Sequence, residues 1–89
     1  MKNMIRVYTI DNCPYCAELK EILTNEGVEF TEVNVDLPEN EPEFNLLYEV
    51  TKSNDVPVVK IGNRLLVPTI SFKSIRECYE ITKILLNKS

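Results

Sequence analysis

Histidine is absent from this chain of 89 residues, and cysteine occurs only three times. A structural zinc site takes four ligands, most often cysteine and histidine. Cys13 and Cys16 could supply two of them, but Cys78, the third cysteine, lies far along the sequence. The sequence therefore does not favour a metal site, and we expect no metal cofactor.

Long apolar runs are also missing, since none approaches the roughly 18 residues that a membrane-spanning helix needs. The first ten residues, MKNMIRVYTI, are basic and then apolar, as in a secretion signal, but the apolar part is only about five residues long. We expect a β-strand there instead. The sequence thus predicts a single domain over residues 1–89 in the cytoplasm, a reducing compartment where a cysteine pair is more often catalytic or metal-binding than structural.

Acidic residues outnumber basic ones, and the formal net charge is −4. Residues 18–49 hold ten acids and one base, whereas residues 50–89 hold three acids and seven bases. The overall acidity excludes a typical nucleic-acid-binding protein. The basic C-terminal half is either a solvated surface or a site that attracts an acidic partner. We expect a monomer that binds neither nucleic acid nor membrane.

The spacing of apolar and turn residues predicts seven elements in the order β-α-β-α-β-β-α. A β-α-β unit implies that the first two strands pair in parallel, and a closing hairpin adds antiparallel strands. The fold class is therefore α/β, with a four-stranded mixed sheet and three helices. The predicted strands cover residues 4–10, 30–35, 58–61 and 64–67, the last two joined by Gly62-Asn63, and the predicted helices begin at Pro14, near Asn40, and at Ser71 or Ser74.

Several residues indicate where the first two helices begin and end. Gly27 supplies a left-handed end for the first helix. Asn40 caps the second helix, and Glu43 completes a capping box with it. Phe44 and Tyr48 recur at helical spacing, which predicts that both side chains join the core, with an interfacial position as the alternative for Tyr48.

The segment Cys13-Pro14-Tyr15-Cys16 is the strongest chemical signal in the sequence. Asn12 or Cys13 is the N-cap, and Pro14 then lies at or near the first helical position. A helix N-terminus stabilises an anion, so Cys13 is expected to be a thiolate near neutral pH and Cys16 a thiol. Such a pair performs disulfide exchange: Cys13 attacks a disulfide as the nucleophile, and Cys16 then resolves the mixed disulfide.

Cys-Pro-Tyr-Cys after a strand containing Tyr8-Thr9, followed downstream by Val56-Pro57, resembles the glutaredoxins. The resemblance covers nearly the whole chain. It implies a thioredoxin-like fold, a dithiol oxidoreductase that reduces protein disulfides or glutathione mixed disulfides, and glutathione as the reductant. It also implies that Pro57 is cis, which the spacing from the cysteine pair favours over the alternative of a trans proline starting an edge strand. The backbone of Val56 would pair with glutathione or substrate, with Tyr15 and Thr69 beside it.

Several charged positions of that family are uncharged in this chain. Ile10 stands where the family has a lysine, and Ile70 or Ser71 stands where it has an acid. Val67-Pro68 replaces a Gly-Gly pair, and Asp55 replaces a threonine. The glutathione carboxylates thereby lose a cation and its amino group loses an anion.

A second resemblance gives an alternative electron source. Tyr8-Thr9 and the segments 34–36 and 57–59 are similar to NrdH-type redoxins, which pass electrons from thioredoxin reductase to ribonucleotide reductase. The motif of that group between residues 67 and 73 is missing, because this chain reads VPTISFK there. A third alternative is a glutaredoxin-like module that holds an iron–sulfur cluster between two subunits, which the proline after Cys13 disfavours.

Two further side chains have simpler interpretations. Tyr15 joins no apolar stripe, so we expect it to be exposed and able to contact a bound substrate. Cys78 lies on the apolar stripe of the last helix, which predicts a buried and inert thiol rather than a regulatory one.

Overall fold

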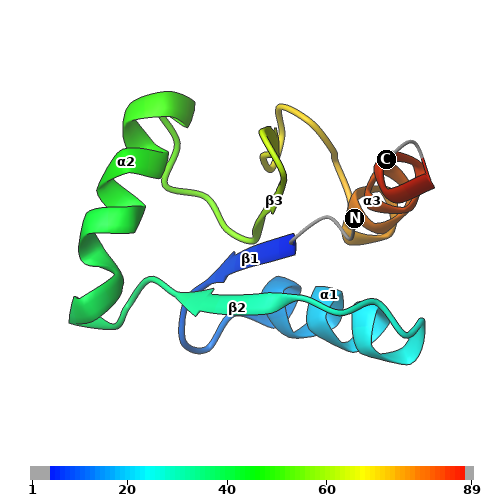
Figure 1. Ribbon diagram of the computed structural model, residues 1–89. Helices are drawn as coiled ribbons and strands as arrows, with labels where there is room; N and C mark the ends of the chain where they lie inside the picture. Colours follow the sequence, from blue (N-terminus) through cyan, green and yellow to red (C-terminus); the bar gives the residue numbers. More distant parts are fainter. Residues whose placement is uncertain (1–4, 88–89) are drawn as a thin grey trace.

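A computed structural model describes residues 5–87 of the chain (Figure 1). The predicted order of elements is confirmed, with one additional 3₁₀ turn before the second helix. Met4, predicted to begin the first strand, lies outside the described residues. The elements are β1 (Ile5–Thr9), α1 (Pro14–Asn25), β2 (Thr31–Asn34), η1 (Pro38–Asn40), α2 (Glu41–Thr51), β3 (Val58–Ile61), β4 (Arg64–Leu66) and α3 (Ile75–Asn87).

The strands form one mixed sheet in the order β2-β1-β3-β4. β1 and β2 run parallel, whereas β1–β3 and β3–β4 are antiparallel pairs. At the centre, Val7 lies opposite Glu32 of β2 and opposite Val59 of β3. Because β3 runs against the other strands, it begins at the edge of the sheet where β1, β2 and β4 end.

Helices cover both faces of the sheet, as Figure 1 shows, with α2 on one side and α1 and α3 on the other. Alternate residues of β1 serve the two layers, since Val7 packs with α1 and α3 while Tyr8 packs with the α2 side. β1 is buried on both faces for this reason. Among residues 5–87, no helix combines the length and apolar character needed to cross a membrane.

The predicted capping box of α2 is wrong. Asn40 precedes the helix but its side chain caps nothing, and its Nδ2 donates to the carbonyl of Asn34 at 2.8 Å. The Glu43 carboxylate turns to the sheet, where Arg6 and Tyr8 donate to it. A charged partner with two donors outcompetes a single backbone amide for this carboxylate.

The side chains of α2 divide between the core and solvent. Phe44 packs against the α2-side core as predicted, together with the buried Leu47. Tyr48 does not join the core, because 40% of its surface is exposed. The other helix ends match their signals: Gly27 is left-handed, and Ser74, rather than Ser71, caps α3 by accepting from the amide of Glu77 at 3.1 Å.

Candidate active site

The cysteine pair lies at the junction of β1 and α1. Asn12 turns the chain with a left-handed φ of 56°, and Cys13 then takes an extended conformation as the N-cap, with Pro14 first in the helix. Of the two predicted caps, Cys13 is therefore the correct one. Cys13 and Cys16 are joined as a disulfide with their Cα atoms 5.2 Å apart.

The start of α1 directs a backbone amide at the sulfur of Cys13. The amide of Cys16 donates to Cys13 Sγ at 3.2 Å, and the first turn of the helix holds no acidic residue. Unpaired amides and the helix dipole at this end stabilise a thiolate. This arrangement supports Cys13 as the more acidic thiol in the reduced protein.

The two cysteines differ in their access to solvent. Cys13 is half-buried, whereas Cys16 is only 1% exposed. A disulfide in solution can reach Cys13 before Cys16, and Cys16 is held where only a group already bound to Cys13 is close. The geometry therefore fits an attacking Cys13 and a resolving Cys16.

A cleft of about 530 Å³ opens beside the cysteines. Its walls come from the β1–α1 turn, from α1 and from β2, and its lining residues are Ile10, Asp11, Asn12, Cys13, Pro14, Cys16, Ala17, Lys20, Glu32 and Asn34. Tyr15, Val56, Pro57 and Thr69, predicted from the family resemblance, are not among them. These four residues thus do not share this cleft, and the polar residues on its β2 side were not predicted from the sequence.

The directions of the strands bring Pro57 and Thr69, two of the residues predicted from the family resemblance, to the same edge of the sheet. The Val56–Pro57 bond is cis, as the resemblance implied, and Pro57 is buried just before β3. Thr69 follows β4, so it lies at the same edge of the sheet as the end of β1 and the start of β3. Thr69 is exposed and left-handed, with φ of 66°, and its amide donates to the carbonyl of Phe72 at 2.9 Å. This amide therefore already has an acceptor.

Three apolar side chains near this edge are exposed. Tyr15 is 64% exposed, as predicted. Ile70 is 70% exposed and Ile10 39% exposed. Ile10, and Ile70 as one of the two residues that match the family's acid, thus present apolar surface to solvent.

Cys78 is remote from this chemistry. Its side chain is fully buried on the core-facing side of α3, as predicted. Burial raises the pKa of its thiol to about 12, although a hydrogen bond with Thr82 acts to lower it. A thiol with this pKa is unreactive near neutral pH. Over residues 5–87, no three potential metal-ligating side chains cluster.

Comparison with known proteins agrees with this geometry. Residues 5–66 match the Glutaredoxin family. A curated relative from Clostridium pasteurianum, an uncharacterized glutaredoxin-like 8.6 kDa protein in a rubredoxin operon, is 33% identical over 66 residues, which cover 72% of this chain and 83% of the relative.

Solved structures show the same fold. A buckwheat glutaredoxin, solved as a complex with glutathione, superposes with a TM-score of 0.73 at 21% identity, over 97% of this chain and 78% of that one. The thioredoxin-like protein BC3987 superposes with a TM-score of 0.68 at 26% identity, over 86% of this chain and 97% of that one. The predicted thioredoxin-like α/β fold is confirmed.

Proposed function

Because this chain belongs to the glutaredoxin family of thiol–disulfide oxidoreductases, we propose that it is a dithiol reductase of protein disulfides and glutathione mixed disulfides. Cys13 is its nucleophile and Cys16 its resolving thiol. The single observation that best supports these roles is the placement of Cys13 Sγ, half-buried at the helix N-cap, where it accepts a hydrogen bond from the Cys16 amide.

The proposed reaction has two exchanges. The Cys13 thiolate attacks one sulfur of the substrate disulfide, and the other sulfur leaves as a thiolate that takes a proton from solvent. Cys16 then loses its proton and attacks Cys13 Sγ, which releases the second substrate thiol. The Cys13–Cys16 disulfide that forms is the bonded pair seen in the structure. Two electrons from a reductant return both cysteines to thiols.

We propose that glutathione is the reductant and that the protein binds it with low affinity. Glutathione carries two carboxylates and an ammonium group, and tight binding needs charges of both signs from the protein. The positions that carry those charges in the family are Ile10 and Ile70 or Ser71 here, and each charged hydrogen bond lost costs about 1.5–3 kcal/mol if nothing replaces it. The backbone of Val56 and the exposed side chains of Tyr15 and Thr69 would still contact a bound thiol substrate, whereas the side chain of Pro57 is buried.

The apolar exposure of Ile10 and Ile70 favours a second candidate, an NrdH-like carrier. Such a protein would take electrons from thioredoxin reductase and pass them to a disulfide-containing protein such as ribonucleotide reductase. A folded protein partner can bury apolar side chains that bound glutathione would leave exposed to solvent. We propose in either case a monomer that works in the cytoplasm without a metal.

Two coupled assays run in parallel separate these electron sources. One contains glutathione, glutathione reductase and NADPH, and the other contains thioredoxin reductase and NADPH, with the same protein disulfide as substrate. We expect turnover in the glutathione arm with a high KM for glutathione, and none for Cys13→Ser in either arm. Turnover in the thioredoxin reductase arm alone would transfer the protein to the NrdH-like group. Turnover of Cys13→Ser at the wild-type rate would refute both.

A further inference from the structure

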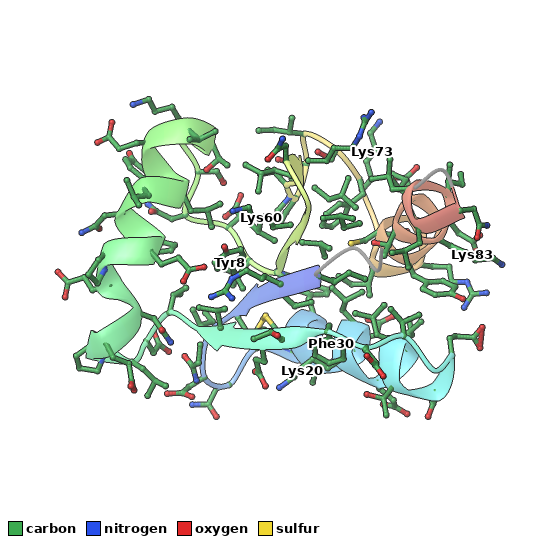
Figure 2. All side chains as sticks on the ribbon, in the orientation of Figure 1. Tyr8, Lys20, Phe30, Lys60, Lys73 and Lys83 are labelled. Atoms are coloured by element: carbon green, nitrogen blue, oxygen red, sulfur yellow. A yellow bond between two sulfur atoms is a disulfide. The ribbon has the colours of Figure 1, made fainter. Side chains whose placement is uncertain are left out.

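An ion pair between two consecutive elements, α1 and β2, lies in the cleft of the cysteines. Lys20 Nζ of α1 donates to Glu32 Oε2 of β2 at 2.9 Å, and Thr9 Oγ1 of β1 donates to the same oxygen at 2.8 Å. Lys20 and Glu32 both line the cleft that Cys13 and Cys16 line. Figure 2 shows Lys20 on α1, below β2 in this view.

Helical spacing places the pair close to Cys16. Lys20 follows Cys16 by four residues in α1, so the two side chains lie one turn apart on the same helix face, with Cβ atoms roughly 5–6 Å apart. Thr9, which fixes the carboxylate, is fully buried at the end of β1. Cys16 is only 1% exposed, whereas the Lys20 and Glu32 side chains are 35% and 38% exposed, so water partly screens the charges of the pair from the Cys16 thiol.

We propose that the Lys20–Glu32 pair sets the proton affinity of Cys16 and thereby the rate at which Cys16 resolves the mixed disulfide. The inference rests on the proposed role of Cys16 as the resolving thiol. The Lys20 ammonium favours a Cys16 thiolate, and the Glu32 carboxylate disfavours it. Bound together, the two charges nearly cancel, so Cys16 stays a thiol while Cys13 attacks.

Two aspartates are the other charged residues in or next to the cleft, among the part of the chain that the structure describes. Asp11 lines the cleft, and its Oδ1 accepts from Asn34 Nδ2 at 2.8 Å. Asp36, in the loop after β2, accepts from the Asp11 amide at 2.8 Å. Both aspartates are exposed, as is Glu32, whereas Lys20 is half-buried, so solvent screens each of these charges in part. Among the described residues that line the cleft, Lys20 is the only cation.

The Glu32 carboxyl is charged near neutral pH. Hydrogen bonds from Lys20 and then from Thr9 lower the pKa of the Glu32 carboxyl, against the smaller opposing effect of burial. Glu32 is therefore an anion at neutral pH and is not itself titrated there. The pair therefore acts on the Cys16 thiol through the electrostatic effect of its two charges, and Glu32 does not accept the proton of Cys16.

Stopped-flow oxidation by the neutral disulfide 4,4′-dithiodipyridine measures the step directly. The Cys13 thiolate attacks the reagent and releases one 4-thiopyridone in a first phase whose rate depends on reagent concentration. Cys16 then gives its proton to solvent and attacks Cys13 Sγ, which releases the second 4-thiopyridone in a phase independent of reagent concentration. The pH profile of the second phase reports the apparent pKa of Cys16.

The two single variants are expected to move the second phase in opposite directions. Lys20→Met leaves the Glu32 carboxylate uncompensated, so the phase slows about three- to tenfold near pH 7 and its pH profile shifts upward. Glu32→Gln leaves the Lys20 ammonium uncompensated, so the phase accelerates by a similar factor and its profile shifts downward. The double variant carries no net charge at the pair and returns towards the wild-type rate.

Matched charge changes on α3 provide the controls. Glu80→Gln and Lys83→Met remove the same charges from exposed positions, and both should keep the wild-type rate. Figure 2 shows Lys83 on α3, away from the disulfide. Changes in the same direction for Lys20→Met and Glu32→Gln, or changes no larger than in the controls, would overturn the inference. A wild-type protein that shows no second phase would instead refute the role of Cys16, and with it the proposed function.

Discussion

Arg6 of β1 donates two hydrogen bonds to the Glu43 carboxylate of α2. Its Nε lies 2.9 Å from Glu43 Oε2, and its Nη2 lies 2.8 Å from Glu43 Oε1. The Tyr8 hydroxyl donates to the same carboxylate at 2.6 Å. Figure 2 shows Tyr8 between the sheet and α2. This contact joins α2 to the strand whose end positions the cysteines.

Replacing Glu43 by Gln should lower the free energy of unfolding by about 1 kcal/mol near pH 7, because the pair is one-third exposed and partly screened. Burial alone would raise the pKa of the Glu43 carboxyl, but hydrogen bonds from Arg6 and Tyr8 and the charges of Arg6 and Lys60 lower it. A carboxyl with a lowered pKa stabilises the fold above its unfolded pKa and loses that effect as pH falls through the folded value.

Urea unfolding of the wild type and Glu43→Gln between pH 7 and pH 3 tests this contribution. The difference between the two proteins should shrink in the acid part of the range. Tyr8→Phe is the matched control, since it removes one hydrogen bond and keeps the ion pair, and its cost should be smaller. A difference that stays constant with pH would contradict the ionic account of the contact.

The contact between Arg6 and Glu43 illustrates which features the sequence predicts: those that depend on neighbouring residues, and not contacts between residues far apart in the chain. Short-range signals predicted an N-cap at Asn12 or Cys13, the Gly27 helix end and the order of elements, because each depends on neighbours in the chain. Glu43 was assigned to the capping box because its true partners lie 37 and 35 residues away.

The pairing of Lys20 with Glu32 escaped prediction for the same reason. Its two members are 12 residues apart and meet only when the β-α-β crossover closes. The spacing of Lys20 from Cys16 is visible in the sequence, but nothing there indicates which carboxylate Lys20 would bind. The cis bond before Pro57 was expected from family resemblance alone, since the residues themselves allow either isomer.

Cys78 should remain unreactive in the folded protein. With its pKa raised to about 12 by burial, it forms almost no thiolate between pH 6 and pH 9. Titration of the reduced protein with 4,4′-dithiodipyridine should consume two thiols quickly and the third only in denaturant. Cys78→Ala should keep the wild-type turnover while losing about 1 kcal/mol of stability. Rapid reaction of three thiols in the native protein would contradict an inert role.

Restoring charge at the two exposed isoleucines should improve the use of glutathione. Ile10→Lys and Ile70→Asp supply a cation and an anion at the family's positions, and together should raise kcat/KM for a glutathione mixed disulfide about three- to tenfold, chiefly through KM. Ile84→Asp on α3, at an isoleucine 54% exposed, is the matched control and should have no effect. Because the acidic residue of the family matches either Ile70 or Ser71, Ser71→Asp is measured alongside. If neither aspartate raises kcat/KM, the loss of charge is not the cause of weak glutathione binding.

The division of labour between Cys13 and Cys16 is the centre of the account, and alkylation tests it most directly. The fully reduced protein is treated with iodoacetamide at pH 6–7, quenched at short intervals, and each cysteine is quantified by peptide mass spectrometry. Cys13 should be alkylated far faster than Cys16 or Cys78, because it alone sits half-exposed at the N-cap of α1 with an amide donor on its sulfur. Alkylation of Cys16 ahead of Cys13 would contradict the assignment of nucleophile and resolving thiol.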